Sequence, residues 1–184
     1  GAELTKNAEA MMEMCGKFDA AQALAMTQYT SALEAIASMT ENSDANDPEA
    51  ISAKANILLG QAWASVSTLS LRQSVGATGV RLQSLWERLS IEGEAPKITE
   101  MAAFANTVEA GKADAGKKFG QAAALYQDAT SKADQYKWSY QRRELQARKA
   151  SHWLTGNADD QSRVELLQQQ LSGMKGFPYT DKDL

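Results

Sequence analysis

One stretch of the chain, residues 136–153, combines the residue types that most often recognise other molecules. Its candidate contact residues are Lys137, Trp138, Arg142, Arg143, Arg148, Lys149 and Trp153. Arginine, tyrosine and tryptophan are enriched at the energetic centres of protein interfaces. The same combination also suits single-stranded nucleic acid, whose bases stack on aromatic rings. A third interpretation is that the rings pack beneath a neighbouring helix while the charges face solvent. We predict a protein-partner site here, and the other two interpretations, nucleic-acid binding and packing beneath a helix, remain open.

No catalytic, metal or cofactor signature accompanies this stretch. His152 is the single histidine, whereas a metal site on helices needs several histidines or glutamates spaced three or four residues apart. The motifs of a nucleophilic serine, a phosphate-binding loop and a dinucleotide fold are absent. The single cysteine, Cys15, lies on an apolar helix face and reads as a small buried hydrophobe. We therefore expect no enzyme activity, no cofactor and no metal.

Composition favours one all-α domain over residues 1–184. The chain has 43% hydrophobic residues, only three prolines and much alanine, and 184 residues are enough for a core without disulfides. Its net charge of −4 weakens a general affinity for nucleic acid or anionic membranes, because both need an excess of Lys and Arg. No run of about 18 apolar residues occurs, so we predict no membrane-spanning helix.

Apolar residues recur at alternating spacings of three and four, which predicts long helices over 3–39, 48–90 and 97–155 and a short one over 159–174. The seam of the first helix includes Leu4, Ala8, Met11, Cys15, Phe18 and, at its end, Met39. Such heptad seams are typical of coiled-coil-like packing. We expect Pro48 to begin the second helix, Gly156 to cap the third, and the tail 175–184 to be loose.

The apolar seam of helix 48–90 slips by one residue just before Gly76 and Gly79. Glycine weakens a helix interior, and kinks and π-bulges occur at such places. The sequence therefore predicts a bend, bulge or short break at residues 73–80. Two interpretations of the small residues remain open, namely close approach of another helix and a functional hinge.

Short loops between long helices make them antiparallel neighbours. We therefore predict an elongated antiparallel three-helix bundle, coiled-coil-like, with the short fourth helix capping one end. About 15 residues of helix 97–155 should project beyond the other two helices. The fourth helix should fold back and cover that projection with Val164, Leu167 and Leu171. An acidic first loop should face the basic stretch, with Glu41, Asp44, Asp47 and Glu49 opposite Lys137, Arg142, Arg143, Arg148 and Lys149.

These features favour a non-enzymatic helical rod that acts through protein–protein contacts. The layout of three long helices with a small helical appendage resembles that of minor pilus proteins of type IV secretion systems. This resemblance implies an extracytoplasmic bacterial surface or secretion-apparatus component. The sequence begins at Gly1 rather than Met. Removal of a signal peptide would place the protein in the periplasm or outside the cell, removal of a tag would leave it in the cytoplasm, and we favour export.

Two other functions remain open at this point. One is a helical bundle that binds a small molecule or lipid in a core cavity. The other is a nucleic-acid binder that uses residues 136–153. A homo-oligomer is compatible with every one of these functions, because Ile57, Trp63 and Trp86 exceed the apolar surface that one bundle buries.

Overall fold

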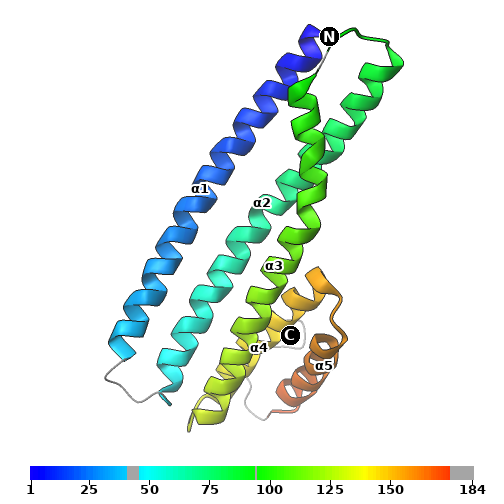
Figure 1. The fold of residues 1–184 in the computed structure, drawn as a ribbon. Helices are drawn as coiled ribbons and strands as arrows, with labels where there is room; N and C mark the ends of the chain where they lie inside the picture. The colour runs from blue at the N-terminus through cyan, green and yellow to red at the C-terminus, as the bar shows by residue number, and fades with distance from the viewer. Residues whose placement is uncertain (41–45, 94, 175–184) are drawn as a thin grey trace. The chain divides into compact units, whose positions relative to one another are not determined.

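The computed structural model describes residues 1–40, 46–93 and 95–174, and this part of the chain contains helices and no strand (Figure 1). The helices are α1 (Ala2–Thr40), α2 (Pro48–Arg88), α3 (Pro96–Lys132), α4 (Lys137–Thr155) and α5 (Ala158–Ser172). The predicted all-helical bundle is confirmed. The predicted helices 3–39, 48–90 and 159–174 correspond to α1, α2 and α5. The predicted loose tail 175–184 lies outside the described residues, as do Glu41 and Asp44 of the acidic loop.

The prediction of one continuous helix over 97–155 is wrong, because α3 ends at Lys132 and α4 begins at Lys137. Tyr136 lies between them in the left-handed region at φ 55°, a conformation that ends a helix. The chain then turns back, and the Ser151 hydroxyl on α4 donates to the Gly116 carbonyl on α3 at 3.2 Å. The predicted projection is therefore absent, and α4 lies along the second half of α3 (Figure 1).

The chain divides into two compact units, and the long helices contribute to both. The first unit is Gly1–Ala25 with Ala64–Lys112, and the second is Met26–Trp63 with Ala113–Leu184. Each unit has a core of its own. A single domain over the whole chain remains a prediction.

The core of the first unit is small and is built from α1, α2 and α3. Its buried members are Ala8, Cys15, Val75, Ile98 and Met101. Beside this core, Arg72 on α2 forms an ion pair with Asp19 on α1 at 2.7 Å and lies 5.5 Å from the centre of the Phe104 ring on α3. Arg72 thus connects all three helices of this unit.

The prediction of a bulge or short break in α2 is wrong, because α2 is α-helical without interruption through residues 73–80, whereas a bend there stays a prediction. Its glycines instead allow α3 to come close. A Cβ atom at Gly76 would lie 2.6 Å from the backbone nitrogen of Ala105, and one at Gly79 would lie 2.7 Å from the carbonyl carbon of Met101. Close helix approach, one of the alternatives raised by the sequence, is thus what the small residues provide.

Cys15 is free and only 2% exposed, as its place on the apolar seam predicts. Burial raises the pKa of its thiol, Asp19 adds to the rise, and Arg72 opposes it. Because the thiolate is the reactive form, we expect iodoacetamide to modify Cys15 on the order of 100-fold more slowly than an exposed cysteine at pH 8.

The matched control for that measurement is the double variant Cys15→Ala/Gly16→Cys, because a Cβ atom at Gly16 would meet nothing within 4 Å. Mass spectrometry over time gives both rates. Equal rates for the two thiols would contradict the buried position of Cys15.

The second unit has two clusters of buried side chains. One joins Ala55 of α2, Ala122, Ala123 and Tyr126 of α3, and Ala147 of α4. The other joins Leu145 of α4 to Val164, Leu167 and Leu171 of α5. The predicted apolar stripe of the last helix is therefore confirmed, and α5 does cover Leu145. Gly156 caps α4 in the left-handed conformation as predicted, with its N–H donating to the His152 carbonyl at 2.7 Å.

Candidate functional site on helices α2 and α4

The predicted contact residues all lie on or beside α4, but they divide between two faces of it. Trp138 packs against the cluster of Leu145, Val164, Leu167 and Leu171. Lys137 is exposed and Arg142 is half-buried. The remaining four, on different faces of α4, are Arg143, Arg148, Lys149 and Trp153.

Arg148 pairs with acidic residues of α4 and α5 rather than with Asp47 or Glu49, so the predicted arrangement is wrong for Arg148 and these described residues. Its Nη1 lies 2.7 Å from Oδ1 of Asp160, a buried residue of α5, and its Nε lies 3.6 Å from Oε1 of Glu144. Its Nη2 donates to Gln127 of α3 at 3.3 Å. The physical reason is that α4 turns back between α3 and α5, which supply Gln127 and the buried Asp160 as partners for the guanidinium.

Glu144 is the centre of this ion-pair network. Its side chain is fully buried, and Arg163 of α5 donates to both carboxylate oxygens, from Nε at 2.8 Å and from Nη2 at 3.0 Å. The hydrogen bonds to Glu144 raise the pKa of the Arg163 guanidinium, so Arg163 stays charged. This network holds α5 on α4, so Arg148 has a structural role. A contact surface on α4 must therefore use the other basic residues of the stretch.

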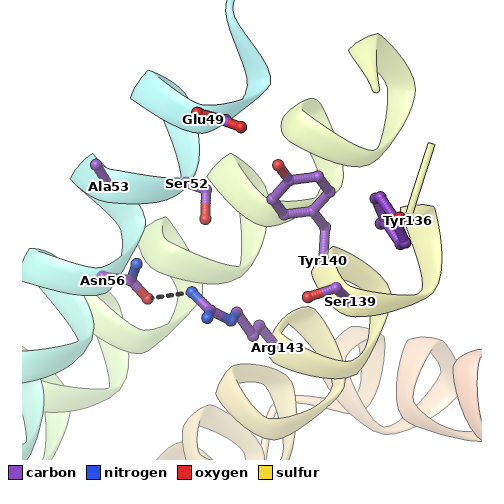
Figure 2. A pocket seen from close by; sticks show the side chains of 8 residues that line it. All are labelled: Glu49, Ser52, Ala53, Asn56, Tyr136, Ser139, Tyr140 and Arg143. Atoms are coloured by element: carbon purple, nitrogen blue, oxygen red, sulfur yellow. Dashed lines mark hydrogen bonds between the residues drawn. The ribbon is translucent and has the colours of Figure 1, made fainter. Parts of the chain in front are cut away.

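Arg143 points to the opposite face, toward α2, where it lines a polar pocket of about 250 Å³ (Figure 2). The lining residues of this polar pocket are Glu49, Ser52, Ala53, Asn56, Tyr136, Ser139, Tyr140 and Arg143. The Arg143 Nη1 donates to Oδ1 of Asn56 at 2.8 Å. Glu49 thus shares a pocket with Arg143, as the predicted acidic–basic arrangement implies, but the guanidinium is bonded to an uncharged amide.

Tyr126 fixes the Asn56 side chain from the core side. Its buried hydroxyl donates to the same Oδ1 atom at 2.7 Å. Asn56 therefore accepts one hydrogen bond from the core and one from Arg143. Burial raises the pKa of the Tyr126 phenol, and the nearby Arg143 guanidinium opposes that rise. The consequence is a guanidinium whose position is set by a buried tyrosine through one amide.

Replacing Tyr126 by phenylalanine should lower the unfolding free energy by about 1 kcal/mol at pH 7, because one hydrogen bond to a buried donor is lost. The folded pKa of Tyr126 is raised, so its contribution is complete below the unfolded value of about 10 and is lost as pH rises through the folded pKa. The difference between wild type and variant should therefore shrink above pH 10.

Urea denaturation at several pH values measures this effect. Tyr136→Phe is the matched control, because the Tyr136 side chain is exposed, and it should change stability by less than about 0.5 kcal/mol. A difference that stays constant or grows above pH 10 would contradict the buried, hydrogen-bonded position of Tyr126.

Lys149 and Trp153 lie further along α4, where they line an apolar groove of about 530 Å³ between α4 and α2. The residues of this tryptophan groove are Leu59 and Trp63 from α2 and Gln146, Lys149, Ala150 and Trp153 from α4. Trp63 is 50% exposed and Trp153 is 70% exposed. Trp63 is held by an edge-to-face contact with Phe119 of α3, with ring centres 4.9 Å apart. One tryptophan is thus anchored and the other is open to solvent.

The structure therefore brings Arg143, Lys149 and Trp153 to one surface and takes Trp138 and Arg148 away from it. It also adds α2 residues that the candidate contact set did not contain, above all Asn56, Leu59 and Trp63. A signal for Trp63 existed, because it is one of the apolar residues of helix 48–90 that the sequence marks as surplus. No signal pointed to Asn56, since its role depends on Tyr126 and Arg143 from distant parts of the chain.

Compared with protein-family models, curated proteins and solved structures, the chain matches none. Among the described residues, no three His, Cys, Asp or Glu side chains gather where they could hold a metal ion. Within those same residues, no helix has the length and apolarity needed to cross a membrane.

Proposed function

We propose that this protein is a non-enzymatic helical bundle that acts through protein–protein contacts, and that the tryptophan groove is its contact surface. The observation that carries the proposal is the pair Trp63 and Trp153, which are 50% and 70% exposed beside a groove of about 530 Å³. Tryptophan is the residue most enriched among interface residues that dominate binding energy. Exposed indole rings that gather at one groove favour an interaction site over a solvated surface.

The finer architecture is part of this proposal. The connections from α1 to α2 and from α2 to α3 are short, which favours an antiparallel three-helix arrangement of α1, α2 and α3. In that arrangement α5 is the cap that the sequence predicts, with α4 between it and the long helices. From the resemblance of the predicted layout to that of minor pilus proteins of type IV secretion systems, we also propose a role as an extracytoplasmic bacterial surface or secretion-apparatus component.

The experiment is affinity capture from lysate and envelope fractions of the source organism, with the wild type compared with Trp153→Ala. Trp153 is chosen because its ring is largely exposed, so its truncation should leave the fold intact. We expect partners to be lost, since truncation at the centre of an interface weakens binding by about 2 kcal/mol or more, or roughly 30-fold. Circular dichroism verifies that the variant is folded.

Leu89→Ala is the matched control for that capture, because Leu89 is also a highly exposed apolar residue and lies in the other unit. Its partners should be those of the wild type. Full retention of partners by Trp153→Ala, or equal loss in both variants, would contradict the proposed surface.

The groove also supports a second candidate, the small-molecule or lipid-binding bundle. Its volume of about 530 Å³ is in the range of small-molecule sites, and its lining is mainly apolar. Saturable binding of the apolar dye ANS that is lost in Trp153→Ala, together with no captured protein, would favour this candidate. Dye binding that Trp153→Ala leaves unchanged would remove its support.

A further inference from the structure

The polar pocket and the tryptophan groove follow each other along the same two helices. Asn56 of the pocket precedes Leu59 of the groove by one helical turn on α2. On α4, Arg143 of the pocket precedes Gln146 of the groove by the same distance. From Glu49 to Trp63 this face of α2 is about 21 Å long, which is the length of a helix of four turns. A single elongated segment can therefore occupy both hollows.

Arg143 and Lys149 are the cations that line this face. Neither Arg143 nor Lys149 takes part in an ion pair within the described part of the chain, whereas Arg148 and Arg163 are paired with Glu144 and Asp160. Lys149 lies at the apolar groove and Arg143 at the polar pocket. The face is thus positive on a chain whose net charge is −4. Its charge complements an acidic partner.

The position of the Arg143 guanidinium is fixed by one hydrogen bond, which uses one of its three nitrogens. Its Nη1 is used by Asn56, which is held in turn by Tyr126. Nε and Nη2 are the two donors that form a side-on, bidentate contact with a carboxylate. Figure 2 shows the Ser52 and Ser139 hydroxyls directed into the same hollow, from α2 and α4. The same hollow is thus lined by a guanidinium and two hydroxyl groups, all of which can donate hydrogen bonds to a carboxylate.

From these observations we infer that the partner is an acidic amphipathic helix lying along the face that α2 and α4 share. One of its carboxylates binds Arg143 in the polar pocket, and its large apolar side chains fill the groove between Trp63 and Trp153. Asn56 and Trp63 are seven residues apart on α2, so the acidic residue and the main apolar anchor of the partner should be separated by about two turns. This inference rests on the proposed function and names the chemistry of the partner.

Glu49 allows a test of whether the partner is acidic, because its negative charge should oppose the binding of an acidic segment. It lies two turns from Asn56 at the other end of the polar pocket, about 10 Å along α2, which is close to the screening length at 0.1 M salt. An acidic occupant is weakly repelled by Glu49 and strongly attracted by Arg143. Glu49→Gln should therefore tighten binding by up to about twofold, whereas Arg143→Gln should weaken it about tenfold.

The experiment is a selection from a displayed random library of helical peptides of about 16 residues. The wild type, Arg143→Gln and Trp153→Ala serve as separate baits. Arg81→Gln is the matched control, because it removes an exposed positive charge from α2 in the other unit. Peptides enriched on the wild type are then synthesised, and fluorescence anisotropy measures their affinities for these variants and for Glu49→Gln.

We expect wild type and Arg81→Gln to enrich peptides with Asp or Glu about two turns from Leu, Phe or Trp. The Arg143→Gln bait should retain the apolar preference and lose the acidic one. Enriched peptides without an acidic preference, or an acidic preference that Arg143→Gln retains, would overturn the inference while the proposed contact surface stands. Equal enrichment on wild type and Trp153→Ala would contradict the contact surface itself.

A second copy of the chain is the competing occupant of the groove, and sedimentation of the purified protein tests it. A dimer that dissociates in Trp153→Ala would overturn the inference, because the groove would then be filled by this chain. If the wild type and Trp153→Ala are both monomers, the result supports a separate acidic partner.

Discussion

Replacing Glu144 by glutamine should lower the free energy of unfolding by about 3–5 kcal/mol, the effect expected when one member of a buried ion pair is removed. The Glu144 side chain is fully buried, and Arg163 donates to both of its carboxylate oxygens. The variant leaves the Arg163 guanidinium half-buried beside an uncharged amide that cannot accept two charged hydrogen bonds equally well. Urea denaturation at pH 7 measures the loss.

Two controls distinguish this mechanism from a general sensitivity of α4 and α5. Glu165→Gln changes an exposed glutamate on α5 and should alter stability by less than about 0.5 kcal/mol. The double variant Glu144→Leu/Arg163→Leu removes both charges and should recover at least half of the loss, since an apolar pair needs no desolvation of ions. A double variant less stable than Glu144→Gln would show that the pair itself stabilises the fold.

Replacing Gly79 by alanine should destabilise the protein by about 3 kcal/mol, at the upper end of the range for added volume in a packed core. The added Cβ atom would meet the backbone of α3, where it would lie 2.7 Å from the carbonyl carbon of Met101 and also overlap the nitrogen of Ala102. Backbone cannot rotate away as a side chain can, so α2 and α3 must separate.

The opposite sign is expected at Gly16, where an added Cβ atom meets nothing within 4 Å. Alanine is favoured over glycine in a helix interior, so Gly16→Ala should stabilise the protein by about 0.5–1 kcal/mol. Thermal and urea denaturation of the two variants measure both changes. Stabilisation by Gly79→Ala would mean that α3 does not approach α2 at this point.

Helix type and the identity of many core residues could be predicted from the pattern, because burial at spacings of three and four is a local property of an amphipathic helix. Ala8 and Cys15 on α1 and Val164, Leu167 and Leu171 on α5 are buried as that pattern indicates. Phe18 and Met39 continue the seam of α1 and are nevertheless exposed. A helix with 3.6 residues per turn drifts away from a heptad seam, so a long series places some members outside the contact.

The turn at Tyr136 could not be predicted in this way. The seam continues on both sides of it with similar small residues, and no glycine or proline stands between Ala133 and Tyr136. Whether α4 extends α3 or folds back depends on the partners available in each arrangement. The folded-back arrangement provides the Gly116 carbonyl for Ser151 and brings Arg148 beside Gln127, and both are contacts of α4 with α3 between residues far apart in the sequence.

The candidate site, like the fold, depends partly on local sequence and partly on long-range packing. The sequence alone determined the helical class, the stretch 136–153 as the richest in contact residues, and the absence of recognisable catalytic motifs, because each depends on residue types and short spacings. Only the tertiary structure decided which of those residues share a surface. It directs Arg143, Lys149 and Trp153 toward α2, where Asn56, Leu59 and Trp63 complete the polar pocket and the groove, and it directs Trp138 and Arg148 toward α5. The physical reason is that a helix has a full circumference of neighbours, and their identity is set by long-range packing that no local pattern encodes.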